Sequence, residues 1–203
     1  MTGLDRIARR ARAALVLAAT AFGLVANPGA ASLGACADQQ DRLAAGEVVV
    51  LDTLPPGASE SAGGGTAVGR VRAAPDRVWA VLVDYRSHPR YYPRVISAEP
   101  VEVDGRHALV RYEVGIGPFS FGFHMLKYPD PARRRVDWLL DPAHPNNFFQ
   151  ENTGYWQVDP AEGGSLVTYA IAVRTILPGF ITRGAERRSL VDTIEKLRAL
   201  VEK

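Results

Sequence analysis

Few side chains in this sequence have the types and spacings that catalysis or metal binding requires. The four histidines show neither HxxxH nor HxH spacing, which argues against a zinc enzyme. The single cysteine excludes an internal disulfide and any multi-cysteine metal site. Ser120 and Ser165 lie outside a GxSxG motif, and the chain contains no glycine-rich phosphate-binding loop. We therefore assign no catalytic residue, no metal site and no cofactor from the sequence.

The remaining polar candidates are one short cluster and several tyrosines. Asp84, His88 and Tyr92 could form a polar group, but we interpret them as residues that cap a helix end and form a turn. General acid–base catalysis needs proton-transferring groups inside a cavity. The inward-facing candidates are mainly phenols, namely Tyr112, Tyr155 and Tyr169, with Arg174 added if a β-bulge turns it inward.

Strands and one terminal helix must position these side chains. The expected strands cover residues 47–51, 66–73, 95–103, 107–116, 119–128, 134–140, 148–158 and 165–176. Gly63–Gly65 predicts a flexible hinge or a hairpin connection. A short helix at 75–85 and a second short helix or turn at 90–94 separate the early strands from the later ones, and a helix at 185–203 ends the chain. Because one helix cannot cover both faces of the sheet, we expect an antiparallel sheet that curls around it, which is an α+β architecture.

Alternation along each strand separates two faces, and the face turned towards the helix is apolar and rich in aromatic residues. These side chains could form an ordinary core or the wall of a pocket for an apolar ligand. For the whole set we favour the pocket, in which phenol and indole groups could orient a carbonyl or hydroxyl group. The predicted ligand-binding residues are Tyr112, Val114, Phe119, Phe121, Phe123, Trp138, Tyr155, Trp156, Tyr169, Ile171 and Ile194.

The order of elements and several motifs resemble the START-like, helix-grip superfamily, which includes polyketide cyclase/dehydratase relatives and coenzyme Q-binding proteins. The resemblance rests on residues 74–95, with Ala-Pro, Val-Trp, Asp-Tyr and a proline-containing turn in that order, on Gly154–Trp156, on residues 163–169 and on the terminal helix. It implies a curved antiparallel sheet wrapped around a long C-terminal helix, with two short helices between the first strands. It also implies binding of a lipid, an isoprenoid quinone or a polyketide-like molecule.

Residues 1–36 have the pattern of an export signal. Four arginines between Arg6 and Arg12 precede an apolar run, residues 13–26, which is shorter than the ~20 residues that span a bilayer. The alternative, an amphipathic helix of a cytosolic protein, is disfavoured because the run is apolar on all sides. We therefore expect a periplasmic protein, in which residues 37–65 form a tether and an N-terminal strand region and residues 66–203 form the folded domain.

Two processing routes are open. Leu33–Cys36 resembles a bacterial lipobox, in which Cys36 becomes the lipidated first residue, and Ala37 after it favours sorting to the outer membrane. Ordinary cleavage after Ala31 or Ala37 would instead release a soluble protein. Beyond residue 36 the chain holds 20 basic and 21 acidic residues, so no nucleic-acid partner is expected.

Three functions remain open from the sequence. The first is an exported protein that holds a hydrophobic small molecule or lipid between the sheet and the terminal helix. The second is a cyclase/dehydratase-type enzyme that uses pocket tyrosines, and the third is an envelope lipoprotein without a ligand. The apolar segment Ile176–Ile181, followed by Arg183, Arg187 and Arg188, predicts contact with anionic lipid headgroups near the cavity mouth, or a loop folded onto its own core.

Overall fold

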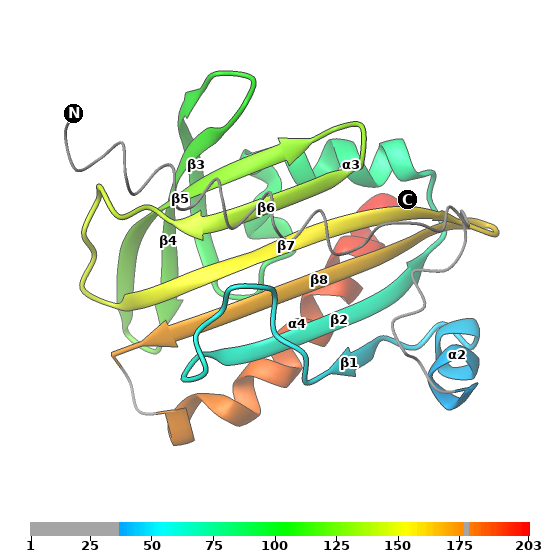
Figure 1. Cartoon of the computed structure of the whole chain (residues 1–203). Coiled ribbons are helices and arrows are strands. Elements are labelled where there is room, and N and C mark those ends of the chain that lie inside the picture. The colour runs from blue at the N-terminus through cyan, green and yellow to red at the C-terminus, as the bar shows by residue number, and fades with distance from the viewer. Residues whose placement is uncertain (1–36, 177–178) are drawn as a thin grey trace. The chain divides into compact units, whose positions relative to one another are not determined.

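The computed structural model describes residues 37–176 and 179–203. Within them, eight strands form one antiparallel sheet in the order β1-β2-β8-β7-β6-β5-β4-β3 (Figure 1). The strands are β1 (Val49–Leu51), β2 (Gly63–Val71), β3 (Val95–Val103), β4 (Ala108–Ile116), β5 (Phe119–Asp130), β6 (Arg135–Leu140), β7 (Phe149–Ala161) and β8 (Gly164–Thr175). The helices are α2 (Ala37–Ala44), α3 (Pro75–Val83), the 3₁₀ helix η1 (Tyr85–Arg90) and α4 (Gly179–Val201).

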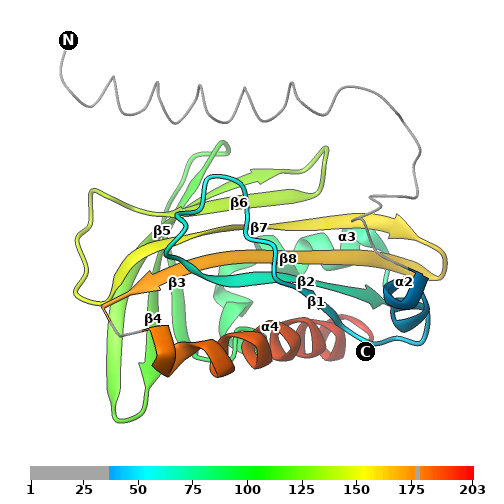
Figure 2. The ribbon, with the colours of Figure 1, turned by 60° about the horizontal axis from the view of Figure 1, so that its bottom comes forward.

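The long C-terminal helix α4 lies along the concave face of the sheet, and β3 and β4 curl towards it (Figure 2). This arrangement confirms the predicted α+β helix-grip architecture. One stripe of α4 is buried, formed by Leu190, Ile194, Leu197 and Val201 at three- and four-residue spacing. A Cβ at Gly69 of β2 would lie 2.6 Å from Ile194 Cγ2, so glycine lets this helix approach the sheet closely.

Local sequence determines where the strands turn and where α3 ends. Gly105 adopts a φ of +82° between β3 and β4, and the Asp104 carboxylate accepts backbone hydrogen bonds from Arg106 and His107 at 2.9 and 2.8 Å. The predicted Asp-Gly hairpin is therefore confirmed. Just after α3 ends, the Ser87 hydroxyl and backbone N–H donate to the Asp84 carbonyl at 2.7 and 2.9 Å and hold the turn into η1.

Several predicted boundaries were wrong. Gly63–Gly65 belongs to β2 and pairs with residues 171–173 of β8. Glycine at residue 64 allows this pairing, because a Cβ there would meet the backbone of Ile171. The second short helix covers residues 85–90 and is followed at 91–94 by the turn that was the alternative for this segment, and α4 begins at Gly179 rather than at residue 185. The polar segment after residue 36 forms the helix α2. Among the described helices, none is both long and apolar enough to cross a membrane.

Candidate ligand-binding cavity

A cavity of about 830 Å³ lies between the concave face of the sheet and the first half of α4. Strands β4 to β8 supply most of its wall, and α4 contributes Ser189, Leu190 and Thr193. The mouth is marked by exposed residues, among them Glu60, Arg94 and Gln150. The opposite end is lined by buried side chains, so the cavity runs from a polar rim to an enclosed end.

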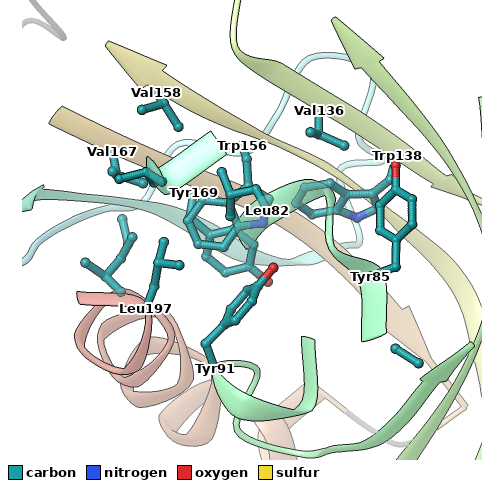
Figure 3. Packing of buried hydrophobic residues seen from close by; sticks show 14 of the residues in the cluster. Leu82, Tyr85, Tyr91, Val136, Trp138, Trp156, Val158, Val167, Tyr169 and Leu197 are labelled. Carbon is teal, nitrogen blue, oxygen red and sulfur yellow. The ribbon is translucent and has the colours of Figure 1, made fainter. Parts of the chain in front are cut away.

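Stacked aromatic rings close the enclosed end, where Trp138 and Tyr169 line the cavity and Trp156 lies in the core beside Tyr169. The ring centroids of Trp156 and Tyr169 are 4.3 Å apart, and those of Trp138 and Tyr169 are 5.8 Å apart (Figure 3). Trp156 Nε1 donates to the Tyr92 hydroxyl at 2.6 Å, and Trp138 Nε1 donates to Asn152 Oδ1 at 3.1 Å. Both indoles are thus held in fixed orientations by their hydrogen bonds.

A buried histidine supports the tyrosine in the middle of the cavity wall. His88 Nε2 lies 3.1 Å from the Leu82 carbonyl oxygen, which can only accept, so Nε2 carries the proton. His88 Nδ1 therefore accepts the hydrogen bond from the Tyr112 hydroxyl at 2.6 Å. Burial, and then the nearby charge of Lys127, hold the pKa of His88 well below its usual range. The imidazole is neutral, and it fixes the position of the phenol.

One cationic side chain lies among these rings. Lys127 of β5 is 4% exposed and lines the cavity. Its Nζ lies 4.3 Å from the Trp138 ring centroid and 5.3 Å from that of Tyr112. Burial lowers the pKa of this amine to about 7, because the ammonium form loses its hydration. A buried lysine is rare unless it is paired.

Six of the eleven predicted binding residues line the cavity together. They are Tyr112, Val114, Phe123, Trp138, Tyr169 and Ile171. Arg174 also lines it, near a register shift between Phe149 and Glu151 of the adjacent strand β7. Its Nη1 donates to Gln150 Oε1 at 2.8 Å, at the rim.

The structure places the other five predicted residues elsewhere. Phe119 is 66% exposed because it lies at the turn between β4 and β5, beyond the part of the sheet that α4 faces. Phe121 is half-buried and stacks on Phe148, with ring centroids 4.5 Å apart. Trp156 and Ile194 are buried in the core rather than along the cavity.

Tyr155 points to the opposite side of the sheet from Trp156, because neighbouring residues of a strand alternate faces. The guanidinium of Arg135 lies 3.7 Å from the centroid of its ring, on the outer surface. The structure therefore places neither Tyr155 nor Trp156 along the cavity.

Sequence reasoning missed Lys127 and the buried role of His88. The signal for Lys127 was available, since it follows Phe123 and Met125 in the alternation that places their side chains inside. His88 was grouped with Asp84 and Tyr92, but its burial depends on Tyr112 of β4, which no local pattern places beside it.

Two other predicted features fall partly or wholly outside the described residues. They are the export signal with Cys36, and residues 177–178 of the apolar segment 176–181. Gly179–Gly184 lies within α4 rather than in a loop. In the described part of the chain, no group of three or more His, Cys, Asp or Glu residues could hold a metal ion.

Comparison with known proteins gives one family and a set of similar folds. A family model described as "Polyketide cyclase / dehydrase and lipid transport" matches residues 66–202. No curated protein matches the sequence. The STAR-related lipid transfer protein from Xanthomonas axonopodis is 17% identical with a TM-score of 0.63, and the match covers 77% of this chain and 93% of that one.

Two further solved structures are similar. The Zhui aromatase/cyclase from Streptomyces sp. R1128 is 19% identical with a TM-score of 0.56, and the match covers 68% of this chain and 90% of that one. A START superfamily protein from Mycobacterium smegmatis is 18% identical with a TM-score of 0.58, and the match covers 68% of this chain and 95% of that one. At these identities the likeness shows a shared fold.

Proposed function

The chain belongs to the polyketide cyclase / dehydrase and lipid transport family, and from this membership and the geometry of its cavity we propose that it is a binding protein for a hydrophobic small molecule or lipid. The observation that carries the proposal is the cavity itself, about 830 Å³ between sheet and helix. That volume lies within the range of about 300–1,000 Å³ typical of small-molecule sites. Apolar burial would supply the affinity, at roughly 25 cal/mol per Å² of surface removed from water.

The enzyme alternative has less support from the geometry. Burial raises the pKa values of Tyr112 and Tyr169 well above their usual range, so both phenols stay protonated and are poor bases. Tyr155 lies on the outer face. Both ring nitrogens of His88 are occupied by hydrogen bonds, which leaves no free position for proton transfer to a ligand.

Native mass spectrometry of the protein purified from its own host tests the binding proposal. We expect a co-purifying hydrophobic molecule, whose mass would also identify it. Val114→Trp fills the cavity from β4 and should abolish retention of this molecule. Val103→Trp makes the same change at a residue that is 63% exposed on the edge strand β3, and should leave retention intact. Absence of any ligand, or equal retention in both variants, would count against a carrier and favour a ligand-free envelope protein.

The sequence of residues 1–36 supports export to the periplasm, and we propose that Cys36 is lipidated there. Metabolic labelling with a fatty acid should mark the wild-type protein and not Cys36→Ser. An unlabelled wild-type protein whose first residue is Ser32 or Asp38 would instead establish ordinary signal cleavage.

We also propose that the end of the molecule with the cavity mouth contacts a membrane surface. Phe119 and Ile176 are exposed there, at 66% and 58%. Phe119 pairs with Ile116 and Ile176 follows Thr175, and both of these neighbours line the cavity. Sedimentation with anionic vesicles should decrease in Phe119→Asp and not in Val103→Asp, an equally apolar exposed position on β3. Unchanged sedimentation of both variants would remove this surface from the proposal.

A further inference from the structure

Lys127 is a buried cation without a partner in the described part of the chain. Its side chain forms no ion pair and no hydrogen bond with residues 38–176 or 187–203. The aromatic faces of Trp138 and Tyr112 give the ammonium some stabilisation, but a ring face replaces its hydration only in part. A carboxylate supplied from outside the protein would complete the site, because a charge-assisted hydrogen bond is among the strongest that an amine forms.

The surroundings of Lys127 add a second hydrogen-bond donor to the same wall. Asn152 Oδ1 accepts the hydrogen bond from Trp138 Nε1, which leaves the amide –NH₂ group of Asn152 as a donor on the same wall. The Tyr112 hydroxyl gives its proton to His88, so its oxygen can only accept and offers no hydrogen bond to a carboxylate. The enclosed end of the cavity thus offers hydrogen-bond donors beside Trp138, whereas the walls towards the mouth carry apolar side chains such as Val114, Ile116 and Ile171.

We propose that Lys127 binds the anionic headgroup of the ligand, and that the ligand is therefore a long-chain carboxylic acid that enters headgroup first. This inference rests on the proposed binding function and narrows it to one chemical class. The carboxylate would lie against Lys127 at the enclosed end, and the hydrocarbon chain would extend past Val114 and Ile171 to the mouth. A neutral lipid of the same length would fill the same space and leave the amine unpaired.

The test compares dodecanoate with methyl dodecanoate, which has the same chain and no charge, by quenching of intrinsic tryptophan fluorescence. The wild-type protein should bind dodecanoate about 10- to 100-fold more tightly than the ester, as expected for a charge-assisted hydrogen bond in an apolar site. Lys127→Met should lose this preference and keep its affinity for the ester. Lys196→Met, an exposed lysine of α4, should behave like the wild type.

The pH dependence of the wild-type protein gives a readout that needs no variant. Above about pH 7 the free amine is neutral, so binding a carboxylate requires uptake of a proton, and dodecanoate affinity should fall by at most about tenfold per pH unit up to pH 9. The ionisable groups at the same end of the cavity hold their charge state over that range: His88 on η1 stays neutral, and Tyr92, Tyr112 on β4 and Tyr169 on β8 stay protonated. The remaining charged groups that line the cavity are at its mouth: Glu60, Arg94 and Arg174.

The outcomes separate this inference from the proposed function. Equal affinity of the wild type for acid and ester, or a preference that survives in Lys127→Met, would overturn the role of Lys127 and leave the hydrophobic binding function standing. Failure of both ligands to bind, together with the absence of a co-purifying molecule, would overturn the binding function itself. Loss of the preference in Lys127→Met alone supports the inference.

Discussion

Replacing Lys127 with methionine should stabilise the ligand-free protein at neutral pH. The amine is buried among aromatic rings and has no counter-ion in the described part of the chain. Methionine has a similar length, fills the same space and carries no charge to desolvate. We therefore expect Lys127→Met to increase the free energy of unfolding. Such an increase is uncommon for a substitution at a buried position.

The pKa of Lys127 sets the size and the pH range of this effect. Its pKa falls from 10.5 to about 7 on folding, so between these values the unfolded chain keeps a proton that the folded protein has released. The free energy of unfolding of the wild type consequently rises with pH across this window. The destabilisation caused by burying the Lys127 amine is largest at and below pH 7. At about 1.4 kcal/mol per pKa unit, the free energy of unfolding of Lys127→Met should exceed that of the wild type by about 4 kcal/mol at pH 7. The gain should shrink as pH approaches 10.

Urea denaturation followed by tryptophan fluorescence at pH 7, 8 and 9 measures this difference. Taking wild type and variant at each pH cancels the other groups that titrate. Lys196→Met provides the matched control on the exposed face of α4, and its stability should track that of the wild type. A difference between Lys127→Met and wild type that is the same at all three pH values would refute the reasoning, because it would mean that the amine keeps its hydration when the protein folds.

Three further outcomes follow from the same site. Tyr112→Phe leaves His88 Nδ1 without its donor and should lower the free energy of unfolding by about 1–3 kcal/mol in the same assay; an unchanged value would mean that water replaces the phenol. His88 should remain neutral and protonated at Nε2 at pH 6 in ¹⁵N NMR spectra, and stability should fall as pH drops below 6.5, where only the unfolded chain takes up the proton; an imidazolium signal at pH 6 would contradict this. Gly154→Ala places a Cβ 2.2 Å from the Ala170 carbonyl oxygen and 2.5 Å from the Trp138 ring, so it should cost about 3 kcal/mol or more, and a wild-type melting temperature would show that the strands can separate there.

Strand alternation alone places much of the cavity wall. Tyr112, Phe123 and Trp138 each lie at inward positions, because side chains along a strand point to alternate faces whatever the sheet later does. The same rule applied strictly would have excluded Tyr155 once Trp156 was assigned inside. It also places Lys127 inside, two residues after Met125 on the same face of β5.

Other residues could not have been placed from local pattern. Phe119 has inward parity, yet it is exposed, because the turn between β4 and β5 extends beyond the region that α4 covers. The burial of His88 depends on Tyr112, which is 24 residues away and belongs to another element. Such contacts depend on how distant segments pack, and no short window of sequence contains them.

The sequence by itself determined the elements of this protein, the apolar face of its sheet and the buried stripe of its last helix, because each follows from periodicity within one segment. Whether these surfaces meet tightly or enclose a space was decided only by the tertiary structure. α4 packs mainly against β2, where Gly69 admits Ile194, while β4 to β7 curve round with their side chains facing an open volume. The curl of the sheet relative to the helix leaves that volume unfilled, and the same packing buries the amine of Lys127 beside it.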